Sequence, residues 1–164
     1  MSGSGYRSHH QDLRTGSFSK ENNRAKRYAL KRLGERDYST EGLRKTLNKK
    51  EFTEKEIRAA ILYCKKMGLL HDSLLAQKIL QKVAESRKGA LYARWALEKK
   101  GIPPHIASSA LKKYYPKGKE LKTGRALIGH TKKSERKRVR SLLQRKGFSE
   151  SAIEQLEVEF ERDE

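Results

Sequence analysis

The sequence predicts an all-α protein in which tandem three-helix units, each resembling a helix-turn-helix, form an elongated curved array. Three observations predict this class. A pattern centred on Leu97 occurs three times, with copies around Leu47 and Leu143. Apolar residues recur at three- and four-residue spacing, and no stretch alternates apolar and polar residues as a half-buried strand would.

Each copy of the pattern predicts a helix, a tight turn and a second helix. An apolar residue lies four positions before the leucine, and a large apolar residue lies five positions after it. An arginine also lies three positions before each leucine, namely Arg44, Arg94 and Arg140. These arginines flank the apolar seam, so we expect them to anchor neighbouring helices through carboxylate or carbonyl contacts.

The turns of the pattern predict helix ends in the left-handed conformation. Gly101 and Gly147 occupy the turn in the second and third copies, where glycine adopts this conformation at little cost. Glu51 takes the same place in the first copy, so that turn breaks the glycine rule. Thr53 and Glu56 follow it with the spacing of a capping box, which predicts a helix start.

The first repeat is predicted over residues 24–70, after a tail at residues 1–23. The tail is rich in Gly, Ser, His, Asn and Arg, and we expect it to be disordered. The helices of this repeat are predicted over about 24–34, 40–50 and 53–67. Gly68 is expected to end the last of them.

The second and third repeats are predicted over residues 71–116 and 117–164. Asp72 is expected to N-cap the first helix of the second repeat. Pro116-Lys117-Gly118 predicts a linker between the two repeats. The other helices of the second repeat are predicted over about 90–100 and 104–115. The third repeat is predicted to have a helix over about 119–128, a second helix that ends at Lys146 and a third over about 149–160.

The charge predicts an anionic partner. The 164 residues include 39 Lys and Arg against 20 Asp and Glu, which gives a formal net charge of +19. This excess of positive charge indicates that the partner is either a polyanion or an acidic protein surface, and the alternative is a generally solvated basic surface.

Cys64 is the single cysteine, so no intramolecular disulfide can form and a reducing cytoplasm is the expected location. No apolar run has the length of a membrane span, and we expect no membrane partner.

A mixed aromatic and basic stripe is the first candidate for the binding surface. On an ideal helix, Lys88, Tyr92, Trp95 and Lys99 share one face, opposite the apolar seam. Such a face suits base stacking and phosphate contact, or an acidic groove in a protein filament. The alternative is that Tyr92 and Trp95 pack against a neighbouring repeat, and the sequence leaves both interpretations open.

A second candidate surface consists of cations that recur at the ends of the repeated helices. Each copy has a pair there, which gives Lys49 with Lys50, Lys99 with Lys100, and Arg145 with Lys146. Compensation of the helix dipole is the alternative explanation, but it does not require two cations per copy. We therefore favour a shared binding surface. Arg136 and Arg138 belong to a further basic cluster that resembles a nucleic-acid patch, with the alternative that such a run of charges is only a solvated face.

We expect no catalysis. The sequence has no phosphate-binding glycine loop, no Cys and His metal spacing, and no nucleophile with a supporting base. The protein is therefore predicted not to be an enzyme, and no cofactor or metal is expected.

The order and spacing of the repeats resemble the RecX family of recombinase regulators. The resemblance covers roughly residues 25–160 and is most specific at Gly68-Leu69-Leu70-His71-Asp72, at Ser86-Arg87-Lys88-Gly89 and at the Lys100-Gly101-Ile102 turn. His71, Leu75 and Glu51 depart from the usual family residues at packing or capping positions.

The resemblance implies a negative regulator of the RecA recombinase. Such a protein would lie in the groove of the RecA–single-stranded DNA filament and would impede filament extension, ATP hydrolysis and strand exchange, and so modulate DNA repair and the SOS response. The implied partners are the RecA filament and single-stranded DNA, with double-stranded DNA as a further candidate, and we expect the chain to act as a monomer. The alternative hypothesis is a stand-alone helix-turn-helix-like DNA-binding module.

Overall fold

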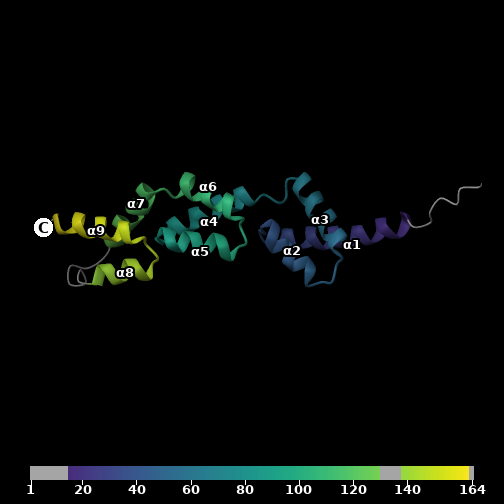
Figure 1. The fold of residues 1–164 in the computed structure, drawn as a ribbon, viewed down its shortest axis with the longest axis horizontal. Helices are drawn as coiled ribbons and strands as arrows, with labels where there is room; N and C mark the ends of the chain where they lie inside the picture. The colour runs from purple at the N-terminus through teal and green to yellow at the C-terminus, as the bar shows by residue number, and fades with distance from the viewer. Residues whose placement is uncertain (1–14, 130–137, 163–164) are drawn as a thin grey trace, which may run out of the picture.

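The protein is all-α over the residues that the structure describes. The computed structural model describes residues 15–129 and 138–162, and within them it contains nine helices and no strand (Figure 1). The predicted fold class is therefore confirmed. The helices are α1 (Thr15–Glu35), α2 (Thr40–Asn48), α3 (Glu54–Lys66), α4 (Asp72–Glu85), α5 (Ala90–Lys99), α6 (Pro104–Tyr114), α7 (Lys117–Ile128), α8 (Val139–Arg145) and α9 (Glu150–Arg162). None of these helices is long and apolar enough to cross a bilayer.

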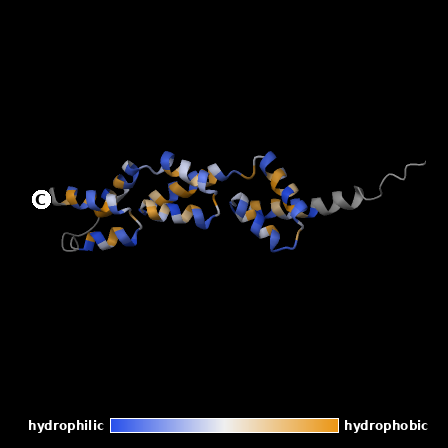
Figure 2. Ribbon diagram, in the orientation of Figure 1, coloured by the Kyte–Doolittle hydropathy of each residue, from blue (hydrophilic) through white to orange (hydrophobic). Residues whose placement is uncertain are grey.

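The apolar residues form three separate cores. One core lies among α1–α3 and includes Leu43, Leu47 and Ile57. A second lies among α4–α6, and a third among α7–α9. Figure 2 accordingly shows hydrophobic residues in all three of these helix groups rather than at one centre. We refer to these helix triplets as the first, second and third units, and they follow one another along the long axis (Figure 1).

The repeated turn has the same backbone conformation in all three units. Gly101 and Gly147 have φ angles of 71° and 74°, and Glu51 has a φ of 59° at the corresponding position. In the second unit the Gly101 amide donates to the carbonyl of Glu98 at 2.8 Å, which satisfies a free carbonyl at the helix end. The predicted capping box of Thr53 and Glu56 is also present.

Two segments are helical where the sequence predicts otherwise. The predicted tail covers residues 1–23, but α1 begins at Thr15, and residues 1–14 lie outside the described part of the chain. Polar residues without proline can extend a helix whose later turns are packed, so composition alone misplaces this boundary. The linker predicted after Pro116 is also wrong, because Pro116 is the N-cap of α7 and Lys117 begins the helix.

The second helices of the three units run head to tail. The hydroxyl of Ser39, the N-cap of α2, donates to the carbonyl of Lys100 at the C-cap of α5. One unit further on, the amide of Gly89, the N-cap of α5, donates to the carbonyl of Lys146 at 2.9 Å. Each joint therefore places the carbonyl end of one helix against the amide end of the next, which is the favourable alignment of their dipoles. We call this line α8–α5–α2 the helix row (Figure 1).

A buried carboxylate reinforces each joint. Asp72 in α4 accepts from the Thr40 amide at 2.7 Å, and Glu120 in α7 accepts from the Ala90 amide at 2.9 Å. Thr40 and Ala90 are the first residues of α2 and α5, so both carboxylates satisfy helix N-termini in the preceding unit. The N-cap role predicted for Asp72 is therefore wrong. His71 is the N-cap of α4, and Asp72 is the first helical residue, with its carboxylate directed at the other unit.

Replacing Gly89 by alanine is expected to destabilise the joint between the second and third units. A Cβ atom there would lie 2.2 Å from the Cα of Phe148 and 2.4 Å from the carbonyl oxygen of Gly147. The φ of Gly89 is −84°, so the substitution tests the close approach and not backbone strain. We expect a loss of about 2–3 kcal/mol in the free energy of unfolding, measured by urea denaturation.

Gly34 provides the control for this substitution. It lies in α1, and a Cβ atom there would meet nothing within 4 Å. Gly34→Ala should leave stability unchanged or raise it by up to about 1 kcal/mol. A Gly89→Ala protein as stable as the wild type would contradict the close packing of this joint.

Candidate functional site

The stripe predicted on the second helix of the middle unit forms a continuous series of ring and cation contacts. The Lys88 ammonium lies 4.9 Å from the centre of the Tyr92 ring, and the Lys99 ammonium lies 4.5 Å from the Trp95 ring. The Tyr92 and Trp95 rings are 5.2 Å apart at their centres and inclined by 46°. Lys88 precedes α5 by two residues and the other three lie on it, so we call this series the α5 ladder.

The two aromatic residues of the α5 ladder differ in exposure. Tyr92 is half-buried against the second core, and its amide donates to the Gly147 carbonyl of the third unit at 3.2 Å. Trp95 is 48% exposed. Tyr92 therefore packs partly against a neighbouring repeat, as one of the two interpretations of the sequence holds. Trp95 instead leaves much of its indole open to solvent.

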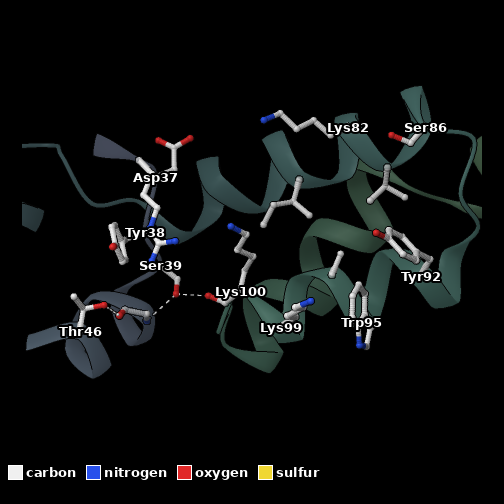
Figure 3. Close-up of a pocket in the computed structure, with 15 residues that line it drawn as sticks. Asp37, Tyr38, Ser39, Thr46, Lys82, Ser86, Tyr92, Trp95, Lys99 and Lys100 are labelled. Carbon is white, nitrogen blue, oxygen red and sulfur yellow. Dashed lines mark hydrogen bonds between the residues drawn. The ribbon is translucent and has the colours of Figure 1, made fainter. Parts of the chain in front are cut away.

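A groove of about 600 Å³ lies at the joint between the first and second units (Figure 3). In this view Tyr38 and Ser39 of the first unit lie across the groove from Tyr92 and Trp95 of the second. Its charged and aromatic lining residues are Arg36, Asp37, Tyr38, Lys82, Tyr92, Trp95, Lys99 and Lys100, and we call it the joint groove.

The joint groove is electropositive. Four of its lining residues are cations, and its one carboxylate, Asp37, forms an ion pair with Lys78 at 3.1 Å. The Arg36 guanidinium lies 4.5 Å from the centre of the Tyr38 ring, and the Arg32 guanidinium donates to the Tyr38 hydroxyl at 2.8 Å. Burial acts to raise the pKa of Tyr38, but the Arg36 and Arg32 guanidinium groups outweigh it, so that this pKa lies below its ordinary value.

Only part of the predicted basic surface lies at the joint groove. Lys99 and Lys100 line it, whereas Lys49 and Arg145 are exposed at the C-terminal ends of α2 and α8. Lys49, Lys99 and Arg145 therefore place one exposed cation on each helix of the helix row. The row does not bring these three side chains together at one point.

The remaining predicted cations have separate surroundings. The Lys50 ammonium lies 5.9 Å from the centre of the Tyr28 ring. Lys146 is half-buried at the joint with the second unit, and Arg138 is exposed at the N-cap of α8. Arg136 lies outside the described residues.

The repeated arginines contact carboxylates in the first and third units. Arg44 pairs with Glu54 at 2.6 Å, and Arg140 pairs with Glu150 and with Glu157. Glu54 and Glu150 begin α3 and α9, so each pair links the second helix of a unit to its third. Arg94 is exposed and makes no ion pair with another described residue, because Pro104 takes the corresponding place at the start of α6.

Four further residues show what periodicity does not identify. Arg36, Tyr38 and Lys82 line the joint groove, yet they lie far from α5 in the sequence and share no helical register with it. Glu120 is 3% exposed and joins two units, although its sequence surroundings resemble an ordinary solvated helix face. No group of three or more His, Cys, Asp or Glu residues suited to a metal ion occurs among the residues that the structure describes.

Comparison with known proteins gives a consistent set of relatives. No family model matches the chain. A protein named Regulatory protein RecX from Trichlorobacter lovleyi is 28% identical over 138 residues, covering 78% of this chain and 90% of the relative. One of the same name from Prosthecochloris aestuarii is 26% identical over 131 residues, covering 77% and 87%. The crystal structure of RecX from Lactobacillus salivarius superposes with a TM-score of 0.73 at 20% identity, covering 87% of this chain and 98% of that one.

Proposed function

We propose that the chain is a member of the RecX family of regulatory proteins and, as such, a negative regulator of a RecA recombinase. It binds in the groove of the recombinase–single-stranded DNA filament and impedes filament extension, ATP hydrolysis and strand exchange. The regulator acts without chemistry of its own, as a monomer in the cytoplasm, and through the filament it modulates DNA repair and the SOS response.

The observation that carries this proposal is the extent of the similarity together with the form of the molecule. The alignment covers 78% of this chain and 90% of the Trichlorobacter relative, so it extends into all three units and is not confined to one helical motif. The units are strung along one axis (Figure 1), and each presents an exposed cation on the helix row. A long, positively charged molecule suits a long, anionic partner, because many weak contacts add along the shared length.

The alternative function, a stand-alone helix-turn-helix-like DNA-binding module, predicts a different surface. Such a module places one recognition helix in the major groove and reads base edges with polar side chains. The α5 ladder instead exposes an indole, a group suited to stacking on unpaired bases. The exposed indole therefore favours the function of a filament regulator over that of a module that reads double-stranded DNA.

The test of the proposed function is the ATPase activity of a RecA filament on single-stranded DNA. We expect the protein to inhibit hydrolysis at substoichiometric amounts, because one bound molecule that stops extension affects every later subunit. A duplex reader would instead bind double-stranded DNA with base preference and leave the recombinase active. Failure to inhibit hydrolysis, together with failure to bind the filament, would falsify the proposal.

A further inference from the structure

We propose that the joint groove is a binding site for single-stranded nucleic acid, in which one base stacks on Trp95 and the adjoining phosphates meet the surrounding cations. The inference rests on the proposed function in one respect, since the strand bound in the cell is taken to be the DNA of the filament. It adds which surface of the protein contacts the nucleic acid rather than the recombinase.

The stacking position is defined by the exposure of a large aromatic ring. Trp95 is the single tryptophan of the chain and is 48% exposed, although its helix contributes Ala93 and Leu97 to a buried core. The Tyr92 ring lies against one part of the indole and the Lys99 ammonium against another, so both restrict how the ring can turn. A restrained, open indole is a platform for an unpaired base of any sequence.

The phosphate position is defined by cations from both units. Lys99 and Lys100 come from the end of α5, Lys82 comes from α4, and Arg36 follows α1 in the first unit. Asp37 is the only carboxylate among the residues that line the groove, and Lys78 pairs with it. A strand whose base lies on Trp95 therefore has ammonium and guanidinium groups along the same groove for its phosphates, and one paired carboxylate to repel them.

The combination of groups favours a nucleic-acid strand over an acidic peptide. An acidic peptide would satisfy the cations, but its side chains offer the exposed indole no flat partner. A nucleotide supplies a planar base and an anion within one repeating unit, and both have counterparts here. The groove is formed by two units, so a strand within it would also hold the first joint of the helix row.

The experiment uses the fluorescence of Trp95 in the full chain, titrated with a short oligodeoxythymidylate in the absence of recombinase. Because no other tryptophan is present, stacking of a base on the indole should quench the signal directly. Binding by the variants is measured from the anisotropy of a dye-labelled oligonucleotide. We expect Trp95→Ala to weaken binding about tenfold, and Trp95→Phe, which keeps a stacking ring, to restore most of it.

The controls lie on the same helix outside the groove. Leu91→Ala removes another exposed apolar side chain, and Arg94→Ala removes an exposed cation, and both should bind within about twofold of the wild type. Circular dichroism verifies that every variant keeps its helicity. Binding by Trp95→Ala equal to the wild type overturns the proposal, as does equal quenching by poly-glutamate.

The quenching and ATPase measurements together test the nucleic-acid site in the groove separately from the proposed function. If the oligonucleotide leaves the indole unquenched while the wild-type protein still inhibits the recombinase ATPase, the groove assignment is wrong and the regulatory function stands. If the oligonucleotide quenches and the ATPase is unaffected, the groove is a nucleic-acid site in a protein whose proposed function is wrong.

Discussion

Reversing Lys49, Lys99 and Arg145 to glutamate in one protein is expected to abolish filament binding at physiological salt while leaving the fold intact. All three side chains are exposed, and each lies at the C-terminal end of a different helix of the helix row. Replacing three attractive charges by three repulsive ones should weaken binding at least about a hundredfold and reduce its dependence on salt. The measurement is filament binding at several salt concentrations, with circular dichroism to follow helicity.

A matched triple variant distinguishes the effect of where the charges lie from the effect of the net charge. Lys65, Lys112 and Lys117 are exposed on α3, α6 and α7, one in each unit but none on the helix row. Their reversal to glutamate changes the net charge by the same amount. We expect this control to bind far more tightly than the first variant. Equal weakening would mean that binding follows overall charge, and a parallel loss of helicity in the first variant would mean that its cations serve the fold.

Replacing Glu120 by alanine is expected to destabilise the fold far more than the same replacement of an exposed carboxylate. One carboxylate oxygen accepts from the amides of Ala90 and Ser149, at 2.9 and 2.8 Å, and the other accepts from the Ser149 hydroxyl at 2.8 Å. Alanine would leave these half-buried donors at the starts of α5 and α9 without this acceptor. We expect a loss of about 3 kcal/mol in the free energy of unfolding, measured by urea denaturation.

Glutamine provides the informative comparison at this position. Its carbonyl oxygen can accept from both amides, and its amino group can donate to the Ser149 hydroxyl, so Glu120→Gln should cost only about 1 kcal/mol. Glu98→Ala, at an exposed position on α5, should change stability by less than about 0.5 kcal/mol. If Glu120→Ala behaved like Glu98→Ala, the carboxylate would contribute nothing to the joint between the units.

The repeated turn is predictable because it depends on residues close together in the sequence. A leucine, a turn and a capping signal at fixed spacing specify a helix end and a helix start whatever the tertiary context. The joints are not predictable in this way. Ser39 meets Lys100 across 61 positions and Ala90 meets Glu120 across 30, so no periodicity within one unit indicates the partner.

Glu51, which stands where the other two copies of the turn have glycine, shows that tertiary contacts as well as the local backbone conformation decide which residue the turn accepts. All three turns require a positive φ, and Glu51 adopts it at 59°. Gly147 has a second requirement, because a Cβ atom there would lie 2.8 Å from the Cβ of Tyr92 in the preceding unit. Glu51 belongs to the first unit and is exposed, with no earlier unit against its turn. A side chain is therefore tolerated at the end of the helix row but not inside it.

The binding surface is predictable only in part for the same reason. The α5 ladder consists of Lys88, just before α5, and three residues on that helix, so helical periodicity identifies all of its members. The joint groove depends on how the first unit sits against the second, and this arrangement brings Arg36 and Tyr38 to the groove that Trp95 also lines. Composition can predict an anionic partner for the chain but cannot indicate where that partner binds.

The most direct test of the proposed regulation is electron microscopy of the protein mixed with RecA filaments on single-stranded DNA. The proposal predicts additional density that follows the filament groove, with the three units resolved along it and the joint between the first and second units facing the DNA strand. Filaments of unchanged appearance, or density confined to free duplex ends, would contradict it.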